Sequence, residues 1–141
     1  MREFVWEGIL RNPFRAIAVS GEVDAPIGRS QRTPTKMAVT VRGKPARTSY
    51  QVVERRGIDT LAPTTLLELS LQSGRTHQVR VHMAAIGHPV VGDARYGKPD
   101  KRLGSGRFFL HAFALAFDHP VTGQRNEFTS PLPEDLQRYL D

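Results

Sequence analysis

The segment of residues 67–89, LELSLQSGRTHQVRVHMAAIGHP, changes its hydrophobic period halfway along. Over residues 67–71 every second residue is leucine, and this alternation predicts a strand with one buried face. Val79, Met83 and Ile86 are then spaced by four and three, which places them on one face of a helix. The segment therefore predicts a strand, a short turn and an amphipathic helix.

Residues at both ends of this helix fit its expected start and stop. Thr76 is a candidate N-cap, because a threonine hydroxyl can accept a hydrogen bond from an unpaired backbone N–H of the first turn. Gly87 can adopt the left-handed conformation that often follows a helix, and Pro89 cannot continue one. We therefore expect the helix to run from Thr76 to just before Gly87.

The sequence before this unit predicts further strands. Residues 14–19 form a largely apolar, β-branched run, so we expect a strand there, followed by a loop over residues 21–35. Residues 37–41 and 46–54 both alternate, and the turn GKP at 43–45 separates them. This arrangement predicts an antiparallel hairpin.

The sequence after the helix predicts two strands and a last helix. Residues 108–117 are apolar on both faces, which is typical of a central strand covered on both sides. A turn at Thr122-Gly123 leads into a short strand ending at Phe128, and residues 131–140 predict an amphipathic helix. Mostly antiparallel strands with few helices indicate an α+β fold with a mixed, mostly antiparallel sheet, and residues 1–141 fit a single domain.

Composition limits the classes of partner and the cellular location. The net charge is +6 and the pI about 10.3, which favours a polyanionic partner, nucleic acid first and an anionic membrane second. The chain has no cysteine, which excludes disulfides and cysteine-ligated zinc. No apolar run reaches the roughly 20 residues of a membrane span, and residues 1–10 lack the pattern of a signal peptide. We therefore expect a cytoplasmic protein that does not enter a membrane.

The start of the expected helix is where charged and polar side chains gather. Arg75 and Arg80 flank it, and a helix N-terminus carries positive dipole and unpaired N–H groups that favour an anion. The alternative is an ordinary solvated helix end with arginines nearby.

Residues 74–82, GRTHQVRVH, and residues 87–97, GHPVVGDARYG, resemble the signature of the RluA/RluD-like pseudouridine synthases. Further segments resemble other motifs of that family, so the likeness extends over nearly the whole chain: AIAVSG at 16–21, DAPIGR at 24–29, KMAV at 36–39, GKPARTSY at 43–50, FLHA at 109–112 and TSPL at 129–132.

The resemblance implies conversion of uridine to pseudouridine in ribosomal or transfer RNA, without a metal or cofactor and with the target base turned out into a pocket. It also implies a catalytic aspartate in a His-Arg-Leu-Asp motif, which this sequence does not contain. Arg80 matches the family's active-site arginine, the partner of that aspartate. Phe14 falls where the family usually has a tyrosine that stacks on the base, and the phenylalanine keeps the stacking face without the hydroxyl.

RNA contact is expected from basic and polar residues that lie in or beside these motifs. Phosphate contacts supply affinity with little choice of sequence. The expected set is Arg29, Lys36, Lys44, Arg47, Arg75, Thr76, His77 and Gln78.

Other interpretations stay open. Five histidines invite a metal site, but His77 and His82 are five apart, which does not align them as an i, i+4 zinc pair, so we expect none. The absent aspartate also allows a non-catalytic RNA-binding remnant or one half of a split enzyme. In either case we expect the chain to associate with the missing half or with itself, since a partial sheet exposes strand edges.

Overall fold

The computed structural model describes residues 3–11, 16–60 and 62–141. The described residues form an α+β fold, as the sequence predicts, with eight strands, two α-helices and one 3₁₀ helix. The elements are β1 (Glu3–Arg11), β2 (Ser20–Asp24), β3 (Ile27–Arg29), β4 (Met37–Val39), β5 (Arg47–Arg56), β6 (Thr64–Leu71), α1 (Gln78–Ala85), η1 (Lys101–Leu103), β7 (Leu110–Asp118), β8 (Arg125–Thr129) and α2 (Glu134–Leu140).

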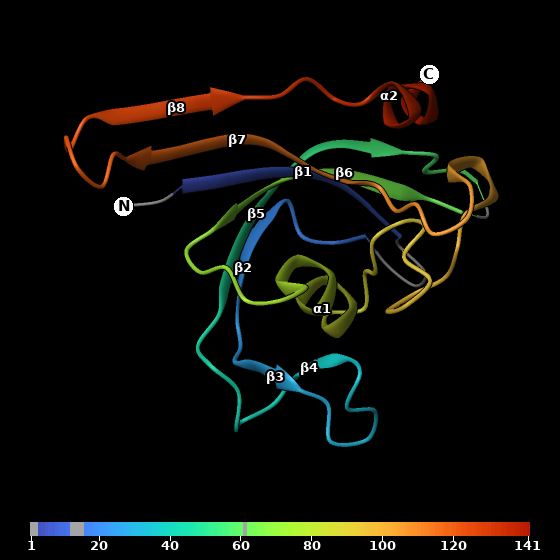
Figure 1. The fold of residues 1–141 in the computed structure, drawn as a ribbon. Coiled ribbons are helices and arrows are strands. Elements are labelled where there is room, and N and C mark those ends of the chain that lie inside the picture. Colours follow the sequence, from blue (N-terminus) through green and yellow to red (C-terminus); the bar gives the residue numbers. More distant parts are fainter. Residues whose placement is uncertain (1–2, 12–15, 61) are drawn as a thin grey trace.

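Six strands make one antiparallel sheet in the order β2-β5-β6-β1-β7-β8, and β3 pairs with β4 in a separate two-stranded sheet. Helix α1 lies under one face of the large sheet, α2 lies against the other face, and β3 and β4 lie beyond α1 (Figure 1). Two cores result. Leu10, Leu67 and Leu69 pack on Val79 and Met83 of α1.

The second core lies on the opposite face of the same sheet. Ile9 of β1 packs there with Phe109 and with Leu136 of α2, and all three side chains are fully buried. Because Ile9 and Leu10 are neighbours on one strand, their side chains point to opposite faces. Strand β1 is therefore covered by both cores. It is a strand that the sequence did not predict.

The start and end of α1 differ in how well they follow the sequence. The predicted N-cap at Thr76 is wrong: His77 caps the helix in the left-handed region, with φ 56° and ψ 25°, and makes no side-chain capping bond. Gly87 has φ 86°, as predicted for the residue after the helix. Val79 and Met83 face the core, whereas Ile86 is 37% exposed because it lies at the C-terminal end of α1.

The predicted hairpin of residues 37–41 and 46–54 is also wrong. Strand β4 pairs with β3, and β5 pairs with β2 and β6. In β5 the alternation matches the buried face, at Thr48 and Tyr50, whereas Val39 and Val41 of the first segment are exposed. In neither case does alternation give the partner strand, because the partners lie elsewhere in the chain. The predicted strand of residues 14–19 is not seen in its described part, 16–19. Strand β2 starts one residue later, at Ser20, and runs into the predicted loop of residues 21–35.

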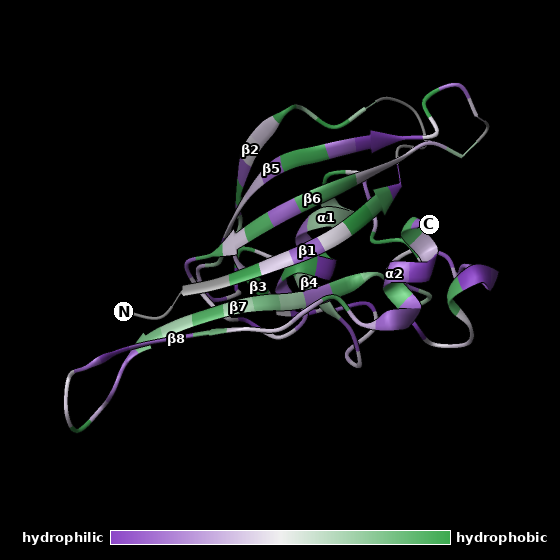
Figure 2. Ribbon diagram, turned by 90° about the horizontal axis from the view of Figure 1, so that it is seen from above, coloured by the Kyte–Doolittle hydropathy of each residue, from purple (hydrophilic) through white to green (hydrophobic). Residues whose placement is uncertain are grey.

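Strand β7 is not the central, doubly covered strand that its composition predicts. It lies second from one edge, between β1 and β8, and most of its residues are only partly buried. Figure 1 shows the far ends of β7 and β8 extending past both helices, and Figure 2 shows β7 apolar along most of its length. The apolar side chains there include Phe117, which stacks on the exposed Phe128. The predicted strand ending at Phe128 and the final helix are confirmed as β8 and α2.

Candidate functional site

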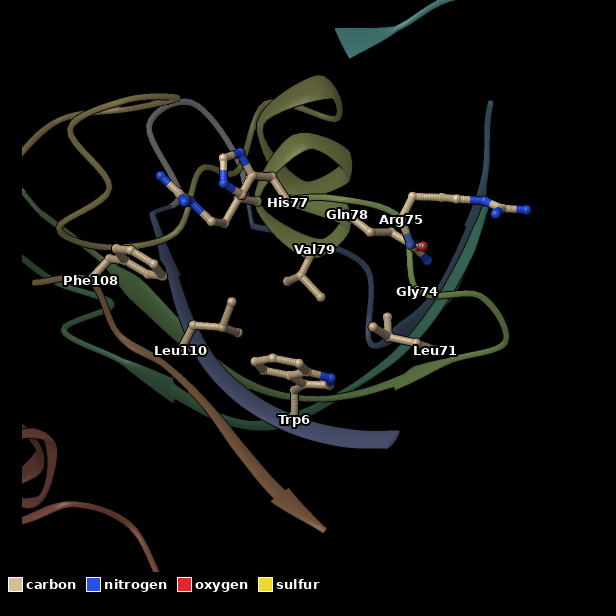
Figure 3. A pocket seen from close by; sticks show the side chains of 10 residues that line it. Trp6, Leu71, Gly74, Arg75, His77, Gln78, Val79, Phe108 and Leu110 are labelled. Atoms are coloured by element: carbon tan, nitrogen blue, oxygen red, sulfur yellow. Dashed lines mark hydrogen bonds between the residues drawn. The ribbon is translucent and has the colours of Figure 1, made fainter. Parts of the chain in front are cut away.

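A pocket of about 390 Å³ lies between the N-terminal end of α1 and the sheet (Figure 3). Its floor is apolar: Trp6 comes from β1, Leu71 from β6 and Leu110 from β7, and Val79 of α1 faces them. The other lining residues are Gly74, Arg75, His77, Gln78, Arg80 and Phe108. The indole N–H of Trp6 is buried and has no hydrogen-bond partner among the described residues.

Arg80 lines this pocket and is held by a buried carboxylate. Its Nε and Nη2 donate to Asp93 at 2.8 and 2.9 Å, and the two side chains are 13% and 0% exposed. The guanidinium carbon lies 4.3 Å from the ring centre of Phe108 and 5.1 Å from that of Tyr96. Burial alone would raise the pKa of Asp93, but hydrogen bonds from Arg80 and from two backbone N–H groups lower it below its ordinary value.

His77 lies at the rim of the pocket, in contact with Tyr96. Its Nδ1 is 2.8 Å from the Tyr96 hydroxyl, and the two rings meet edge to face with centres 5.6 Å apart. Burial lowers the pKa of His77, and the positive charges of Arg80 and Arg95 lower it further. These influences favour the neutral imidazole over the charged form.

Gln78 holds the turn that precedes α1. It is 3% exposed, and its Oε1 accepts from the Ser73 hydroxyl and the Arg75 N–H, while its Nε2 donates to the Arg47 carbonyl and to Thr48 Oγ1. These four bonds leave no polar atom of Gln78 for RNA. The sequence placed it in the RNA-binding set, whereas the structure gives it the role of fixing the pocket wall.

Behind Gln78 the hydrogen bonding continues through Thr48 to the fully buried His82. His82 Nε2 is 2.8 Å from the Ala25 carbonyl, and its Nδ1 is 2.8 Å from Thr48 Oγ1. A carbonyl only accepts, so Nε2 carries the proton and Nδ1 accepts from the threonine. Burial is the largest influence on His82 and lowers its pKa. The network joins α1 to β5 and to the segment before β3.

A second hollow of about 420 Å³ lies beside the first, between the turn that precedes α1 and the β3–β4 pair with the turn after it. Gly74 and Arg75 line both hollows, so the turn before α1 is the wall between them. We call the second hollow the cationic groove, because it is lined by four basic side chains and by no carboxylate. Its lining residues are Ile27, Gly28, Arg29, Met37, Arg42, Gly43, Lys44, Gly74, Arg75 and Thr76.

The groove depends on a close backbone approach at Gly43. A Cβ atom on Gly43 would lie 2.6 Å from the carbonyl oxygen of Ile27, which is closer than side chains tolerate. The two backbones also exchange hydrogen bonds at the next position, between Ile27 and Lys44, at 2.9 Å in both directions. A larger residue at 43 would therefore push Lys44 and the β3–β4 pair apart.

The remaining predicted site residues are placed as follows. Arg29, Lys44, Arg75 and Thr76 all line the cationic groove. Lys36 is half-buried in the β3–β4 connection and does not line it. Arg47 lies outside it, and its guanidinium is paired with Glu22 at 3.0 Å and Asp24 at 3.4 Å. Phe14 lies outside the described residues.

Sequence reasoning missed several residues of the two hollows. Trp6, Phe108 and Leu110 come from strands or turns that are distant in the chain, and nothing local in the sequence singles them out. Tyr96 lines neither hollow but contacts His77 and Arg80, and it could have been found because it stands in the motif at 87–97. Arg42 could have been added to the basic set on its charge alone.

Two further features bear on the class of site. Among the described residues, no group of three histidine, aspartate or glutamate side chains lies close enough together to hold a metal ion. Within the same residues, no helix is long and apolar enough to cross a membrane.

Comparison with known proteins agrees with this architecture. Residues 7–85 match the model of the RNA pseudouridylate synthase family. The chain is 44% identical over 136 residues to an uncharacterized RNA pseudouridine synthase of Chloroflexus aurantiacus, covering 93% of this chain and 42% of that protein. It is 46% identical over 127 residues to ribosomal large subunit pseudouridine synthase D of Nitrosomonas europaea, covering 85% of this chain and 36% of that protein. The chain thus spans about two-fifths of the length of these relatives.

A solved structure shares the fold. The human RNA pseudouridylate synthase domain containing 1 protein superimposes with a TM-score of 0.76 at 29% identity, over 94% of this chain and 55% of that one. The family match covers more than half of the chain and includes β6, the turn after it and α1, which form one part of the pocket lining. The chain belongs to the RNA pseudouridylate synthase family, as an RluA/RluD-like member.

Proposed function

We propose that this chain is the RNA-holding part of an RNA pseudouridine synthase, in which the pocket receives the target base and the cationic groove holds the neighbouring phosphates. The observation that carries the proposal is the shared wall: Gly74 and Arg75 line both hollows. A nucleotide has the same two parts, an apolar base face and a charged phosphate, joined over a short distance. One RNA strand passing over this wall would place each part in a matching hollow.

The pocket suits a base on size and chemistry. Its volume of about 390 Å³ lies in the range of small-ligand pockets, roughly 300–1,000 Å³. Trp6 and Phe108 supply aromatic surface, on which bases stack without preference for one base. Arg80 lines the wall, where two hydrogen bonds to Asp93 and the contact with the Phe108 ring hold its guanidinium. Its position is therefore set before RNA binds.

The groove suits phosphate. Arg29, Arg42, Lys44 and Arg75 contribute four positive charges, and no carboxylate among the lining residues compensates them. Arg29, Arg42 and Lys44 are exposed, so they can reach a backbone that passes outside. Such contacts add affinity and salt dependence, with little choice of sequence. The remaining member of the predicted RNA-binding set nearby, Lys36, would act at longer range.

The catalytic carboxylate is proposed to come from outside these residues. No aspartate or glutamate lines the pocket among the described residues, and Asp93, which binds Arg80, is fully buried behind it. No His-Arg-Leu-Asp motif occurs in the sequence. Arg80 would then serve two carboxylates, Asp93 through Nε and Nη2 and the catalytic one through its remaining nitrogen, Nη1.

The test is a pseudouridine assay on unmodified ribosomal and transfer RNA. We expect no pseudouridine from this chain alone and formation of pseudouridine when a segment carrying His-Arg-Leu-Asp from a relative is supplied. Turnover by the chain alone would contradict the assignment of the carboxylate. The names of the large-subunit relatives favour ribosomal RNA as the substrate, and the cytoplasm stays the proposed place of action.

The absent motif also favours a second candidate, a non-catalytic RNA-binding remnant or one half of a split enzyme. For the remnant and for the half enzyme alike, we expect the missing half or a second copy of the chain to cover the exposed apolar ends of β7 and β8. Size-exclusion chromatography over a range of concentrations tests this expectation. A clean monomer at every concentration, together with no binding to the separate half, would contradict it.

A further inference from the structure

His77 is held in a backbone conformation that its side chain does not favour. Among the described residues it is the one non-glycine residue with positive φ, and it stands at the N-terminal end of α1 beside the pocket. Residues kept in such sparsely populated regions gather at functional sites, where the surrounding structure maintains them. Here the carbonyl of His77 accepts from the Val81 N–H at 2.9 Å, and the ring is held by Tyr96.

Tyr96 determines which nitrogen of His77 carries the proton. The Tyr96 oxygen already accepts the backbone N–H of Met37 at 3.1 Å, so its own hydrogen needs an acceptor. His77 Nδ1 lies 2.8 Å away and can supply that acceptor only when it is unprotonated. The neutral ring then carries its proton on Nε2. Burial and the nearby Arg80 and Arg95 favour the neutral ring as well, whereas Asp93 opposes them weakly.

Most other polar groups of the pocket are used within the described part of the protein, although the Trp6 indole N–H on the floor and Nη1 of Arg80 are not. The amide of Gln78 is fully used within the protein, and Arg80 directs two of its nitrogens to Asp93. Arg75 uses its Nε on the Pro45 carbonyl. His77 Nε2 makes no hydrogen bond to any described residue, which leaves a neutral donor of fixed direction at the rim of an apolar pocket.

Resting on the function proposed above, we infer that His77 is a specificity-determining residue whose Nε2–H donates to the O4 carbonyl of a uracil base in the pocket. Cytosine carries an amino group at the same position. A donor locked by Tyr96 would meet that amino group without an acceptor, and an unmatched donor in a desolvated site weakens binding. The lock therefore selects uracil over cytosine, which a free histidine able to exchange tautomers would not do.

The first test reads the tautomer directly. Two-dimensional ¹H–¹⁵N spectra of the histidine rings distinguish a protonated Nε2 from a protonated Nδ1, and His77→Asn identifies the signals of His77 by their loss. We expect the Nε2–H form in the full chain and a mixture of tautomers in Tyr96→Phe. A protonated Nδ1 in the full chain would overturn the inference.

The second test measures base choice. Trp6 is the one tryptophan of the chain and lines the pocket, so its fluorescence reports binding of hexauridylate and hexacytidylate. We expect hexauridylate to bind more tightly by roughly five- to tenfold, the factor of one hydrogen bond. His77→Asn and Tyr96→Phe should both reduce that preference. Asparagine is chosen at position 77 because it tolerates positive φ, which favours a folded variant.

The outcomes separate this inference from the function on which it rests. Equal binding of the two oligonucleotides by the full chain, or an unchanged preference in both variants, would overturn the role of His77 and leave the RNA-holding function standing. Binding of neither oligonucleotide would overturn the proposed function and the inference together.

Discussion

Replacing Arg80 with methionine is expected to destabilise the fold, because it leaves the buried Asp93 carboxylate without its cation. Asp93 is 0% exposed, and the pair is joined by hydrogen bonds of 2.8 and 2.9 Å. Removing one partner of a buried ion pair costs about 3–5 kcal/mol. The lost contact with the Phe108 ring adds about 0.5–2 kcal/mol.

Two features of the site reduce this cost. The carboxylate keeps the backbone N–H groups of Arg95 and Tyr96, at 3.1 and 3.2 Å, and methionine retains part of the apolar packing of the arginine stem. The expected loss in the free energy of unfolding is therefore about 4 kcal/mol. For a domain with 5–15 kcal/mol in total, a change of roughly this size is easily measured.

Urea unfolding followed by Trp6 fluorescence measures the change, and a second arginine–aspartate pair supplies the control. Arg107 binds Asp135 through the same two nitrogens, at 2.7 and 3.3 Å, but these side chains are 34% and 41% exposed. Arg107→Met should cost about 0–1 kcal/mol, as surface pairs do.

The double variant Arg80→Met with Asp93→Asn should recover about 1–2 kcal/mol, because the unpaired buried charge is removed. Equal losses below about 1 kcal/mol for Arg80→Met and Arg107→Met would refute the buried-pair reasoning.

Two further predictions concern stability. Gly43→Ala should lower the free energy of unfolding by about 1–3 kcal/mol, because its Cβ would lie 2.6 Å from the Ile27 carbonyl oxygen. Gly74→Ala is the control and should change that free energy little, because no atom lies within 4 Å of the added Cβ. Equal urea midpoints for the two variants would contradict this prediction. Stability should also fall with acidification. The pKa of His82 is lowered in the folded state, so the unfolded chain binds more protons. The free energy of unfolding should therefore be constant well above the ordinary histidine pKa of 6.5 and decrease as the pH falls through and below that value. His82→Gln should remove part of that slope in urea titrations at pH 5 to 8, and the part that remains should belong to His77, whose pKa is lowered too; an unchanged slope would contradict the assignment to His82.

Local sequence patterns predicted the elements that bury one face. Strand β6 follows from its alternating leucines, and α1 follows from Val79 and Met83. Strand β1 was missed because Ile9 and Leu10 pack into different cores, so the strand shows no simple alternation. The pairing of β5 with β2 and β6 could not be predicted, since register and partner depend on segments far away in the chain.

The sequence predicted which residues belong to the candidate site, but not which contacts hold them in place. The resemblance singled out Arg80 and the residues around it, but not that Asp93 holds it. It treated Gln78 as an RNA contact, whereas the structure shows four internal hydrogen bonds, two of which depend on Arg47 and Thr48 of the distant strand β5. The floor at Trp6 depends on how β1 enters the sheet, which no local pattern in the sequence reveals.

The most direct measurement of the central claim is the salt dependence of RNA binding by the cationic groove. Three of its exposed cations can be removed together, in Arg29→Ala/Arg42→Ala/Lys44→Ala, and compared with a variant of equal charge that lacks three cations elsewhere, Lys101→Ala/Arg125→Ala/Arg138→Ala. The plot of log affinity against log salt for single-stranded RNA should flatten by about 2 in the groove variant, at roughly 0.7 per phosphate contact, and stay unchanged in the control. Equal slopes in the two variants would show that the groove does not hold the RNA backbone.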